Sequence, residues 1–367
     1  MQVDLIITEL NVGGAERNFV NLAIGLADAG DDVRVFSLGP LPHGEQAQLL
    51  KRLQHRGIDI VSGQATGWRS LPHCYGRLRR WMRGPTREIC QTFLFHANLL
   101  GGLGANSRQY RRMIGGLRVA EDTAWRCRLE SLAVRRMDRL VCVSDAVRRF
   151  AQRRLGCRSD QATVIPNGVD VDTIRQSGPF DWSRVGWPSD AVVSLFVGRL
   201  HPQKGIVDLQ RQVNRLAPKD DPKRRLLIVG DGPQRESLQS WAREQGDQRV
   251  QCLGWRDDVA ALTNACRVLI LPSRYEGMPN VVMEAMAAGR PVVVSGVEGI
   301  EELVPSNAPE QVFRVGDSEA MAGLAERFLA DPEFAAKVGA TNQQHMRSNF
   351  SIQTMVDRYR ALYQSLL

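Results

Sequence analysis

The sequence predicts an α/β protein with two doubly wound parallel sheets, one following the other along the chain. The chain has 367 residues, which suggests two domains at about 100–200 residues each. Short, continuous apolar runs recur along it, as is typical of strands buried on both faces of a sheet. Amphipathic stretches alternate with these runs, and such alternation favours right-handed βαβ units.

The first domain is expected over residues 1–178. After the first apolar run, Gly13 and Gly14 precede apolar residues at helical spacing, which predicts a helix. A second helix is expected near 145–155. The runs that predict buried strands in this domain are VDLIIT (3–8), DVRVFSL (32–38), RLVCVS (139–144) and TVIPNG (163–168).

The second domain is expected over residues 179–349, after a loop rich in Pro, Gly and Trp at 178–190. The final segment, about 350–367, reads as an amphipathic helix. The runs that predict strands here are AVVSLFVG (191–198), RLLIVG (225–230), VQCLG (250–254), RVLILP (267–272) and PVVVSG (291–296). In two such domains ligands are expected beyond the carboxyl ends of the strands, in a cleft between the domains.

The net charge of +8 is concentrated in the first half of the chain. Residues 1–175 hold 26 Lys or Arg against 17 Asp or Glu. Two interpretations stay open: a solvated surface, or attraction to anionic lipid headgroups or an anionic acceptor. Nucleic acid is not expected as a partner, because no nucleic-acid-binding motif accompanies the charge.

The segment RLRRWMRGPTR (77–87) interleaves arginine with Leu, Trp and Met. Such a segment can lie at a membrane interface, or it can be an amphipathic helix packed on the first sheet. No apolar run is long enough to span a bilayer, and the first residues do not have the pattern of a signal peptide. Seven scattered cysteines, including Cys142 and Cys252 in strand-like runs, fit a reducing cytoplasm and not a disulfide or zinc framework.

The segment SRYEGMPNVVMEAMAAG (273–289) places two carboxylates around a predicted helix start. Pro279 suits the first turn of a helix, so that Glu276 precedes the helix and Glu284 lies within it. Amides at a helix start can bind a diphosphate, and the two carboxylates could accept hydroxyls of a sugar and a ribose. The residues expected to contribute amides are Gly277, Met278, Asn280 and Val281.

The segment FVGRLHPQKG (196–205) places Arg199 and Lys204 just beyond a predicted strand. Arginine suits bidentate contacts with phosphate oxygens and lysine supplies a point charge, so the pair could hold a diphosphate leaving group. The segment is not a Walker P-loop, because Gln203 stands where that motif requires glycine.

Two glycine-containing turns could bring backbone amides close to a phosphate. One is NVGGAER (11–17), with Gly13 and Gly14, and the other is GDGP (230–233), which lacks the third glycine of a dinucleotide fingerprint. Asp170-Val171-Asp172 spells the metal-binding D-x-D pattern, but its position after a Pro-Asn-Gly turn favours a helix-start acid. His96 in FLFHANLLGG could be structural or could lie at a strand end facing the cleft.

Together these segments resemble the GT-B glycosyltransferases called group 1, or family 4. The resemblance covers most of the chain, and it is greatest from about 140 to 305. The segments that carry it are GGAER (13–17), VIPNGVD (164–170), VGRLHPQKG (197–205), IVGDGP (228–233), LGW (253–255) and EGMPNVVMEAMAAGRPVVVSGVEG (276–299).

The resemblance implies a role for each matching residue. Glu284 would bind the ribose, and Glu276 the hydroxyls of the transferred sugar. Arg199 and Lys204 would neutralise the departing diphosphate. The remaining implied positions are Gly13, Gly14, Gly230 and Gly254 in donor binding and His96 against the transferring sugar, while the final helix would pack back on the first domain.

The resemblance also implies a reaction. The chain would transfer a sugar from a UDP- or GDP-sugar to a glycan or lipid-linked acceptor, with retention and with neither cofactor nor metal. We expect a cytoplasmic enzyme at the inner face of the membrane, in polysaccharide or lipopolysaccharide synthesis. A nucleotide-sugar epimerase of the same fold and a non-catalytic binder of nucleotide sugar or anionic membrane are the alternatives.

Overall fold

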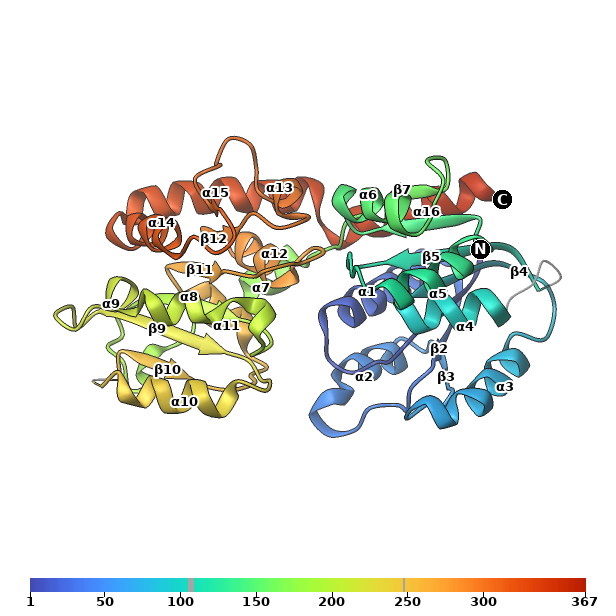
Figure 1. Ribbon diagram of the computed structural model, residues 1–367, viewed down its shortest axis with the longest axis horizontal. Helices are drawn as coiled ribbons and strands as arrows, with labels where there is room; N and C mark the ends of the chain where they lie inside the picture. The colour runs from blue at the N-terminus through green and yellow to red at the C-terminus, as the bar shows by residue number, and fades with distance from the viewer. Residues whose placement is uncertain (105–108, 247) are drawn as a thin grey trace. The chain divides into compact units, whose positions relative to one another are not determined.

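The computed structural model describes residues 1–104, 109–246 and 248–367, which form two compact units (Figure 1). One consists of Met1–Gly168 with Ile352–Leu367, and the other is Val169–Ser351. The boundary lies ten residues before the one the sequence suggested. The reason is α7 (Val171–Gln176), which packs on α11 (Val259–Ala265) and α12 (Asn280–Ala287) of the second unit.

The first unit is built on a wholly parallel sheet in the order β3-β2-β1-β4-β5-β6-β7. Its strands are β1 (Gln2–Ile7), β2 (Asp32–Ser37), β3 (Asp59–Ser62), β4 (Arg87–Phe93), β5 (Tyr110–Leu117), β6 (Arg139–Cys142) and β7 (Ala162–Val164). Its helices are α1 (Gly14–Asp28), η1 (Gly44–Ala47), α2 (Gln48–His55), η2 (Trp68–Ser70), α3 (Leu71–Trp81), α4 (Phe95–Gly104), α5 (Ala124–Val134), α6 (Asp145–Arg154) and α16 (Ile352–Leu366).

Three strands of this sheet, β3, β4 and β5, were not predicted. In β4 charged and polar residues interrupt the apolar pattern, and β5 begins with two arginines and contains Gly115 and Gly116. The buried polar side chains form hydrogen bonds between elements: the Thr92 hydroxyl donates to Asn98 Oδ1 at 2.7 Å, and Asn98 Nδ2 donates to the Gly116 carbonyl at 3.0 Å. Pairing of this kind lets a polar segment occupy a central strand.

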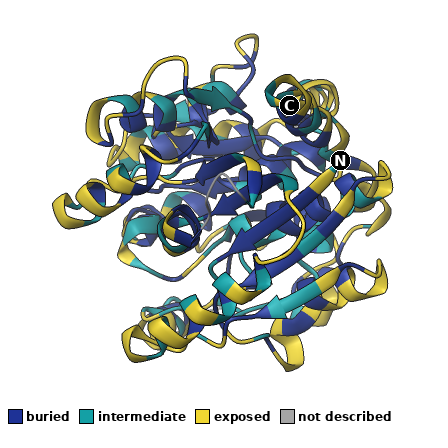
Figure 2. Ribbon diagram, turned by 90° about the vertical axis from the view of Figure 1, so that its right-hand side faces the viewer, coloured by how far each residue is buried: buried dark blue, intermediate teal, exposed yellow. Residues whose placement is uncertain are grey.

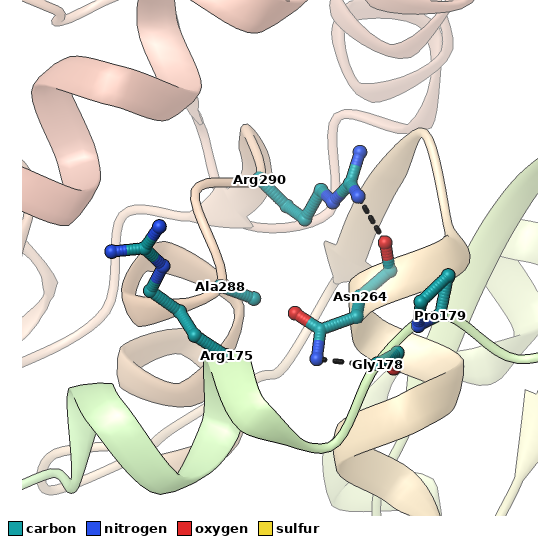
Figure 3. Close-up of a pocket in the computed structure, with 6 residues that line it drawn as sticks. All are labelled: Arg175, Gly178, Pro179, Asn264, Ala288 and Arg290. Carbon is teal, nitrogen blue, oxygen red and sulfur yellow. Dashed lines mark hydrogen bonds between the residues drawn. The ribbon is translucent and has the colours of Figure 1, made fainter.

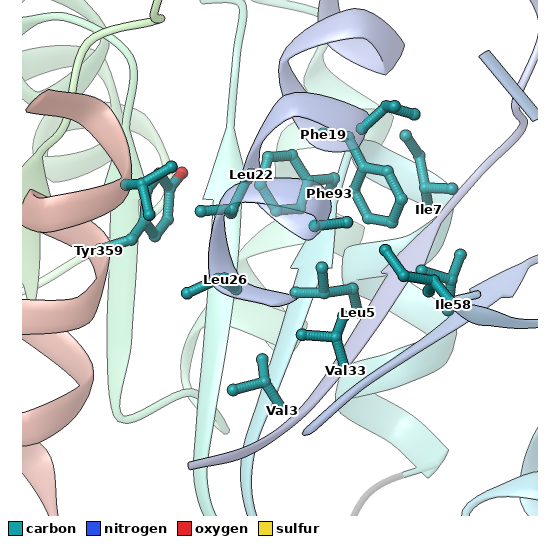
Figure 4. Packing of buried hydrophobic residues seen from close by; sticks show 14 of the residues in the cluster. Val3, Leu5, Ile7, Phe19, Leu22, Leu26, Val33, Ile58, Phe93 and Tyr359 are labelled. Atoms are coloured by element: carbon teal, nitrogen blue, oxygen red, sulfur yellow. The ribbon is translucent and has the colours of Figure 1, made fainter. Parts of the chain in front are cut away.

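The core of the first unit lies between the sheet and a layer that contains α1 and α16 (Figure 4). Phe19 of α1 meets Phe93 of β4 edge to face, and Phe93 stacks in turn on Tyr359 of α16. Tyr359 accepts a hydrogen bond from buried Arg118 at 2.8 Å, and Arg118 also donates to Asn167 at 3.0 Å. The last helix is therefore part of the first unit's core.

The second unit is built on another wholly parallel sheet, in the order β10-β9-β8-β11-β12-β13. Its strands are β8 (Val192–Val197), β9 (Arg224–Val229), β10 (Val250–Cys252), β11 (Val268–Leu271), β12 (Val292–Ser295) and β13 (Val312–Phe313). Only β13, two residues long, was not predicted. Its helices are α7, η3 (Trp182–Val185), η4 (Pro202–Lys204), α8 (Ile206–Arg211), α9 (Val213–Leu216), α10 (Arg235–Glu244), α11 (Val259–Ala265), α12 (Asn280–Ala287), α13 (Ile300–Leu303), α14 (Ser318–Ala330) and α15 (Pro332–Asn349).

The strand order positions the candidate sites. In each sheet the chain first winds toward one edge and then returns to wind toward the other, so the order reverses between β1 and β4 and between β8 and β11. Ligands of doubly wound sheets bind beyond the carboxyl ends of the strands at this reversal. Most strand residues are buried, drawn in dark blue, whereas the exposed residues, in yellow, lie mainly on the outer helices and loops (Figure 2). Over the described residues no helix is long and apolar enough to cross a bilayer.

Candidate functional site

The loop after β8 carries the predicted cations of the second unit. Arg199 is exposed, and its guanidinium forms no ion pair with any residue that the structure describes. Lys204 ends η4, whose first residues are capped by His201. The two side chains therefore follow the strand that borders the point of reversal, as the sequence predicted.

The loop after β11 brings Glu276 to Lys204. The Lys204 ammonium forms an ion pair with Glu276 Oε1, and the two side chains are only 17% and 10% exposed. Ser273 donates a second hydrogen bond to the same carboxylate oxygen at 2.6 Å. Sequence reasoning assigned these two charges to different ligand groups and missed Ser273, although its place at a strand end three residues before Glu276 could have indicated it.

Backbone contacts hold the two loops together. Arg274 donates its amide to the Gln203 carbonyl at 2.7 Å, and Gln203 Nε2 donates to the Tyr275 carbonyl at 3.0 Å. Gly205 adopts a left-handed φ of 65°, and a Cβ there would lie 1.9 Å from the Pro272 carbonyl oxygen. Only glycine allows this approach, so Gly205 fixes the distance between the cations and Glu276.

The start of α12 lies next in the chain. Pro279 is the N-cap and not the first helical residue, which corrects the predicted position by one residue. Its side chain cannot cap the helix, and the first turn has no acidic residue. Asn280 and Val281 are the first two helical residues, and Gly277 and buried Met278 precede them. The first turn of a helix suits an anion, since the helix dipole and its amides favour negative charge.

The other predicted donor residues lie on neighbouring elements of the second unit. Glu284 is just over one turn into α12 and is partly exposed. Gly230, after β9, has a φ of 141°, and a Cβ there would lie 1.8 Å from the Gly198 carbonyl oxygen. Gly254 lies beside Arg235, whose Nη2 would be 3.2 Å from a Cβ at that position. Arg235 is a cation that sequence reasoning did not single out.

A separate pocket of about 210 Å³ lies elsewhere in the second unit (Figure 3). It is lined by Arg175, Gly178, Pro179, Asn264, Ala288 and Arg290. Asn264 and Arg290 are joined by a hydrogen bond, and Asn264 Nδ2 donates to the Gly178 carbonyl at 3.3 Å. These bonds fasten α11 to Arg290 and to the loop after α7. None of the predicted site residues lines the pocket. We therefore place the candidate site at the sheet reversal and not here.

In the first unit, Gly13 and Gly14 begin α1 directly after β1. Gly13 is the N-cap, and a Cβ there would lie 2.2 Å from Glu16 Oε2, so the missing side chain leaves room for the Glu16 carboxyl group. Burial raises the pKa of Glu16 to about 7, and the neighbouring Glu9 adds to the shift. A carboxyl group thus lies where sequence reasoning expected only amides and a phosphate.

His96 lies on the first turn of α4, just past β4, the other strand at the point of reversal. Its ring is exposed and meets Phe95 edge to face at 5.1 Å, and Arg126 lies over the other aromatic ring, that of Phe95. Desolvation and the charge of Arg126 lower the pKa of His96. The lowered pKa favours the neutral imidazole, which can both donate and accept hydrogen bonds.

Two other sequence interpretations are resolved by the structure. Asp170 caps α7 by accepting from the Thr173 amide at 3.0 Å, which confirms a helix-start acid, and Asp172 pairs with Arg347 at 2.9 Å. In the segment 77–87, Met82 is buried, and the ring of Trp81 packs on the Phe36 ring at 5.3 Å. The packed-helix alternative therefore holds for this segment, because its large apolar residues face the sheet.

Comparison with known protein families gives two matches that together span most of the chain. The profile described as "Glycosyltransferase Family 4" matches residues 12–173, and the one described as "Glycosyl transferases group 1" matches residues 191–331. The first match covers most of the sheet with His96, and the second covers the whole candidate donor site.

Proteins with similar sequences are also named as glycosyltransferases. An uncharacterised glycosyltransferase of Methanocaldococcus jannaschii is 31% identical, over 87% of this chain and 86% of its own length. The UDP-Gal:alpha-D-GlcNAc-diphosphoundecaprenol alpha-1,3-galactosyltransferase of Escherichia coli is 27% identical over 64% of this chain. The lipopolysaccharide core biosynthesis glycosyltransferase LpsD of Rhizobium meliloti is 28% identical over 61%. The matches span 62% and 63% of these last two relatives' lengths.

Solved structures share the fold along the whole chain. HepE of Anabaena, solved in complex with UDP-glucose, has a TM-score of 0.83 at 20% identity and covers 100% of both chains. Sucrose-phosphate synthase from Thermosynechococcus elongatus also has a TM-score of 0.83, at 21% identity, over 100% of this chain and 99% of its own. The architecture is thus the GT-B fold, as predicted. With both profiles and a relative matching along its length, the chain belongs to the group 1 glycosyltransferases of family 4.

Proposed function

We propose that this glycosyltransferase transfers a hexosyl group from a UDP-sugar to a lipid-linked glycan precursor. The observation that carries the proposal is the Lys204–Glu276 ion pair at the reversal point of the second sheet, with exposed Arg199 earlier in the same loop as Lys204. The two loops supply two cations and a carboxylate, and the carboxylate lies just before the start of α12. These are the groups that a nucleotide-diphosphate sugar needs.

The donor would bind with its diphosphate between the cations and the first turn of α12. The Lys204 ammonium has three N–H donors, so it can donate to a phosphate oxygen while it keeps its ion pair with Glu276. That pairing holds the carboxylate beside the diphosphate, where it can accept hydroxyls of the sugar. Glu284, further along α12, would accept the ribose hydroxyls.

Transfer would then depend on stabilising the departing UDP. As the bond between the sugar and the diphosphate breaks, negative charge develops on the phosphate oxygen, and fixed cations and amides stabilise it. We propose that Arg199 and Lys204 supply this stabilisation in place of a metal ion. We also propose retention: the acceptor hydroxyl attacks from the side of the leaving group and gives its proton to the departing phosphate oxygen. The roles predicted for Gly13, Gly14 and His96 stay predictions.

The choice of acceptor class is supported by the relatives. One of them is named for an undecaprenol-linked acceptor and another for lipopolysaccharide core synthesis. The arginine-rich first half of the chain suits an anionic lipid-linked substrate. We propose that the enzyme works at an anionic membrane surface.

The test is hydrolysis or transfer of UDP-glucose, UDP-galactose and their N-acetyl forms. Lys204→Ala and Arg199→Ala should each lower kcat at least a hundredfold, the range in which single groups that stabilise transition-state charge act. Lys223→Ala, an exposed lysine paired with Asp190 in the same unit, is the matched control and should keep the wild-type rate. Arg199→Ala is the cleaner variant, because it leaves no described partner without its counter-charge. Wild-type rates in both site variants would refute the assignment.

A further inference from the structure

The outward face of α5 carries a row of exposed apolar side chains. Trp125, Leu129 and Leu132 are 60%, 38% and 52% exposed. Their spacing of four and three residues places them on one face of the helix. Single exposed apolar residues are ordinary on a soluble protein, whereas a contiguous row marks a surface that binds something. We call this row the α5 stripe.

The opposite face of α5 is firmly seated, so the stripe cannot turn inward. Cys127, Ala133 and Val134 are buried, and α5 packs on α4, its neighbour in Figure 1. A Cβ on Gly102 of α4 would lie 3.4 Å from that of Ala133, and buried Glu130 accepts a hydrogen bond from Asn98 at 3.3 Å.

Arginines extend the same face. Arg128 lies within the stripe. Arg135 is the C-cap of α5 and Arg136 lies in the turn that follows, and all three arginines are exposed. None of them forms an ion pair with a residue that the structure describes. From Trp125 to Arg136 the stripe and its arginines extend roughly 16 Å at the rise of an α-helix.

The acidic residues just before α5 do not cancel this charge. Glu121 pairs with Arg126, and Asp122 pairs with Arg154 at the end of α6. Both carboxylates are therefore already neutralised by arginines outside the stripe. The stripe with its three arginines is an apolar surface with net positive charge.

We propose that the α5 stripe docks the enzyme on an anionic lipid bilayer. Trp and Leu side chains would enter the headgroup boundary, and the arginines would contact lipid phosphates, as in helices that lie in the plane of a membrane. The segment 77–87 does not offer such a surface, because Trp81 and Met82 pack inward.

A second copy of this chain is a poorer occupant of the same face. A two-fold dimer brings the same patch of both subunits together, which would place Arg128, Arg135 and Arg136 opposite their own copies. An anionic bilayer complements both the apolar and the charged part of the stripe.

The stripe begins near His96, the residue predicted to lie against the transferring sugar. The Trp125 ring meets Phe95 edge to face at 5.9 Å, and Phe95 meets His96 in the same way at 5.1 Å. A bilayer against α5 would hold the head of a lipid-linked acceptor near His96. Docking gives a surface to the membrane location proposed above, and this last step rests also on the proposed acceptor.

The test is flotation of the full chain with vesicles of equal phosphatidylglycerol and phosphatidylcholine, and with vesicles of phosphatidylcholine alone. Wild type should partition onto the anionic vesicles only, and raised salt should weaken binding. Leu129→Gln with Leu132→Gln should lower partitioning at least tenfold. Arg128→Gln with Arg135→Gln and Arg136→Gln should lower it roughly a hundredfold, at about fivefold per arginine, and should reduce its dependence on salt.

Two matched controls identify the surface. Arg80→Gln with Arg83→Gln removes exposed charge from the other arginine-rich segment, and Trp68→Ala removes the other strongly exposed tryptophan. Both should bind vesicles like wild type. If these controls lose binding while the α5 variants keep it, the docking surface is elsewhere and the proposal is wrong.

Other outcomes also decide the question. Absence of wild-type flotation refutes the proposal, as does a concentration-dependent dimer in sedimentation that the Leu129→Gln, Leu132→Gln variant abolishes. Calorimetric titration of wild type and of that variant with UDP separates the docking from the donor site. UDP binding without vesicle binding in wild type would overturn the docking and the proposed membrane location but not the donor site. Vesicle binding without UDP binding would overturn only the donor site.

Discussion

At the scale of single residues, the charged groups that follow the strands lie in three different surroundings. Lys204 and Glu276 hold each other, Arg199 has no described counter-charge, and the Glu16 carboxyl group is largely desolvated beside Gly13. The Lys204–Glu276 pair is fixed, and the Arg199 guanidinium can bind an anion. The charge of Glu16 changes with pH near neutrality.

Glu16 gives a prediction with a definite sign. Its carboxyl group has a pKa of about 7 in the folded state against an ordinary value of 4.5, so between these values the folded state keeps a proton that the unfolded state has released. Stability of the first unit should therefore fall as pH rises from about 4.5 to 7 and stay lower above it. Glu16→Gln should be more stable than wild type at pH 8 by about 1–3 kcal/mol, and by much less at pH 5.

Thermal unfolding of both proteins at the two pH values measures this difference. Glu45→Gln, an exposed glutamate in η1 of the same unit, is the control and should not change the pH profile. Parallel profiles for Glu16→Gln and wild type would show that Glu16 titrates normally.

At the scale of elements, the site depends on how closely the loop after β8 approaches the end of β11. Gly205→Ala would place a Cβ 1.9 Å from the Pro272 carbonyl oxygen, and it would also put alanine in a left-handed backbone conformation. We expect it to destabilise the second unit by at least about 3 kcal/mol and to weaken UDP binding by displacing Lys204. Gly178→Ala has a similar φ of 67° but no atom within 4 Å, so it should cost only about 1–2 kcal/mol. Calorimetric unfolding compares the two, and equal losses would mean that the close approach is unimportant.

The elements also show what the sequence could predict. Continuous apolar runs predicted β1, β2 and β6–β12. The motifs at their carboxyl ends led us to expect Arg199, Lys204 and Glu276 beyond the strands, and their roles stay predictions. The same reasoning missed β4 and β5, because their polar residues are satisfied by tertiary hydrogen bonds that no local pattern reveals. It also missed the α5 stripe. Apolar residues occur on both faces of α5, and only the packed structure shows that one face is covered and the other exposed.

At the scale of the whole molecule, the chain passes between the two units twice, at 168–169 and at 351–352. The two crossings lie side by side, for the Val169 amide donates to the Phe350 carbonyl at 2.8 Å. Each unit has its own sheet, and the final helix completes the core of the first. The two cores should therefore respond separately to mutation.

Tyr359→Ala tests this separation. It would remove a fully buried ring from between Phe93 and Tyr363 and leave Arg118 without its hydroxyl partner. The first unit should lose about 3–5 kcal/mol of unfolding free energy. Scanning calorimetry should show one unfolding transition at a lower temperature. The other transition, assigned to the second unit because UDP raises its temperature, should not move. An equal shift of both transitions would contradict separate cores.

The most direct test of the central claim is a calorimetric titration of the full chain with UDP, GDP and ADP, each with and without EDTA. A donor site built on Arg199, Lys204 and the start of α12 predicts that UDP binds equally well in EDTA, and that Lys204→Ala weakens it at least tenfold while Lys223→Ala does not. Binding that requires a divalent cation, or that survives unchanged in Lys204→Ala, would contradict it.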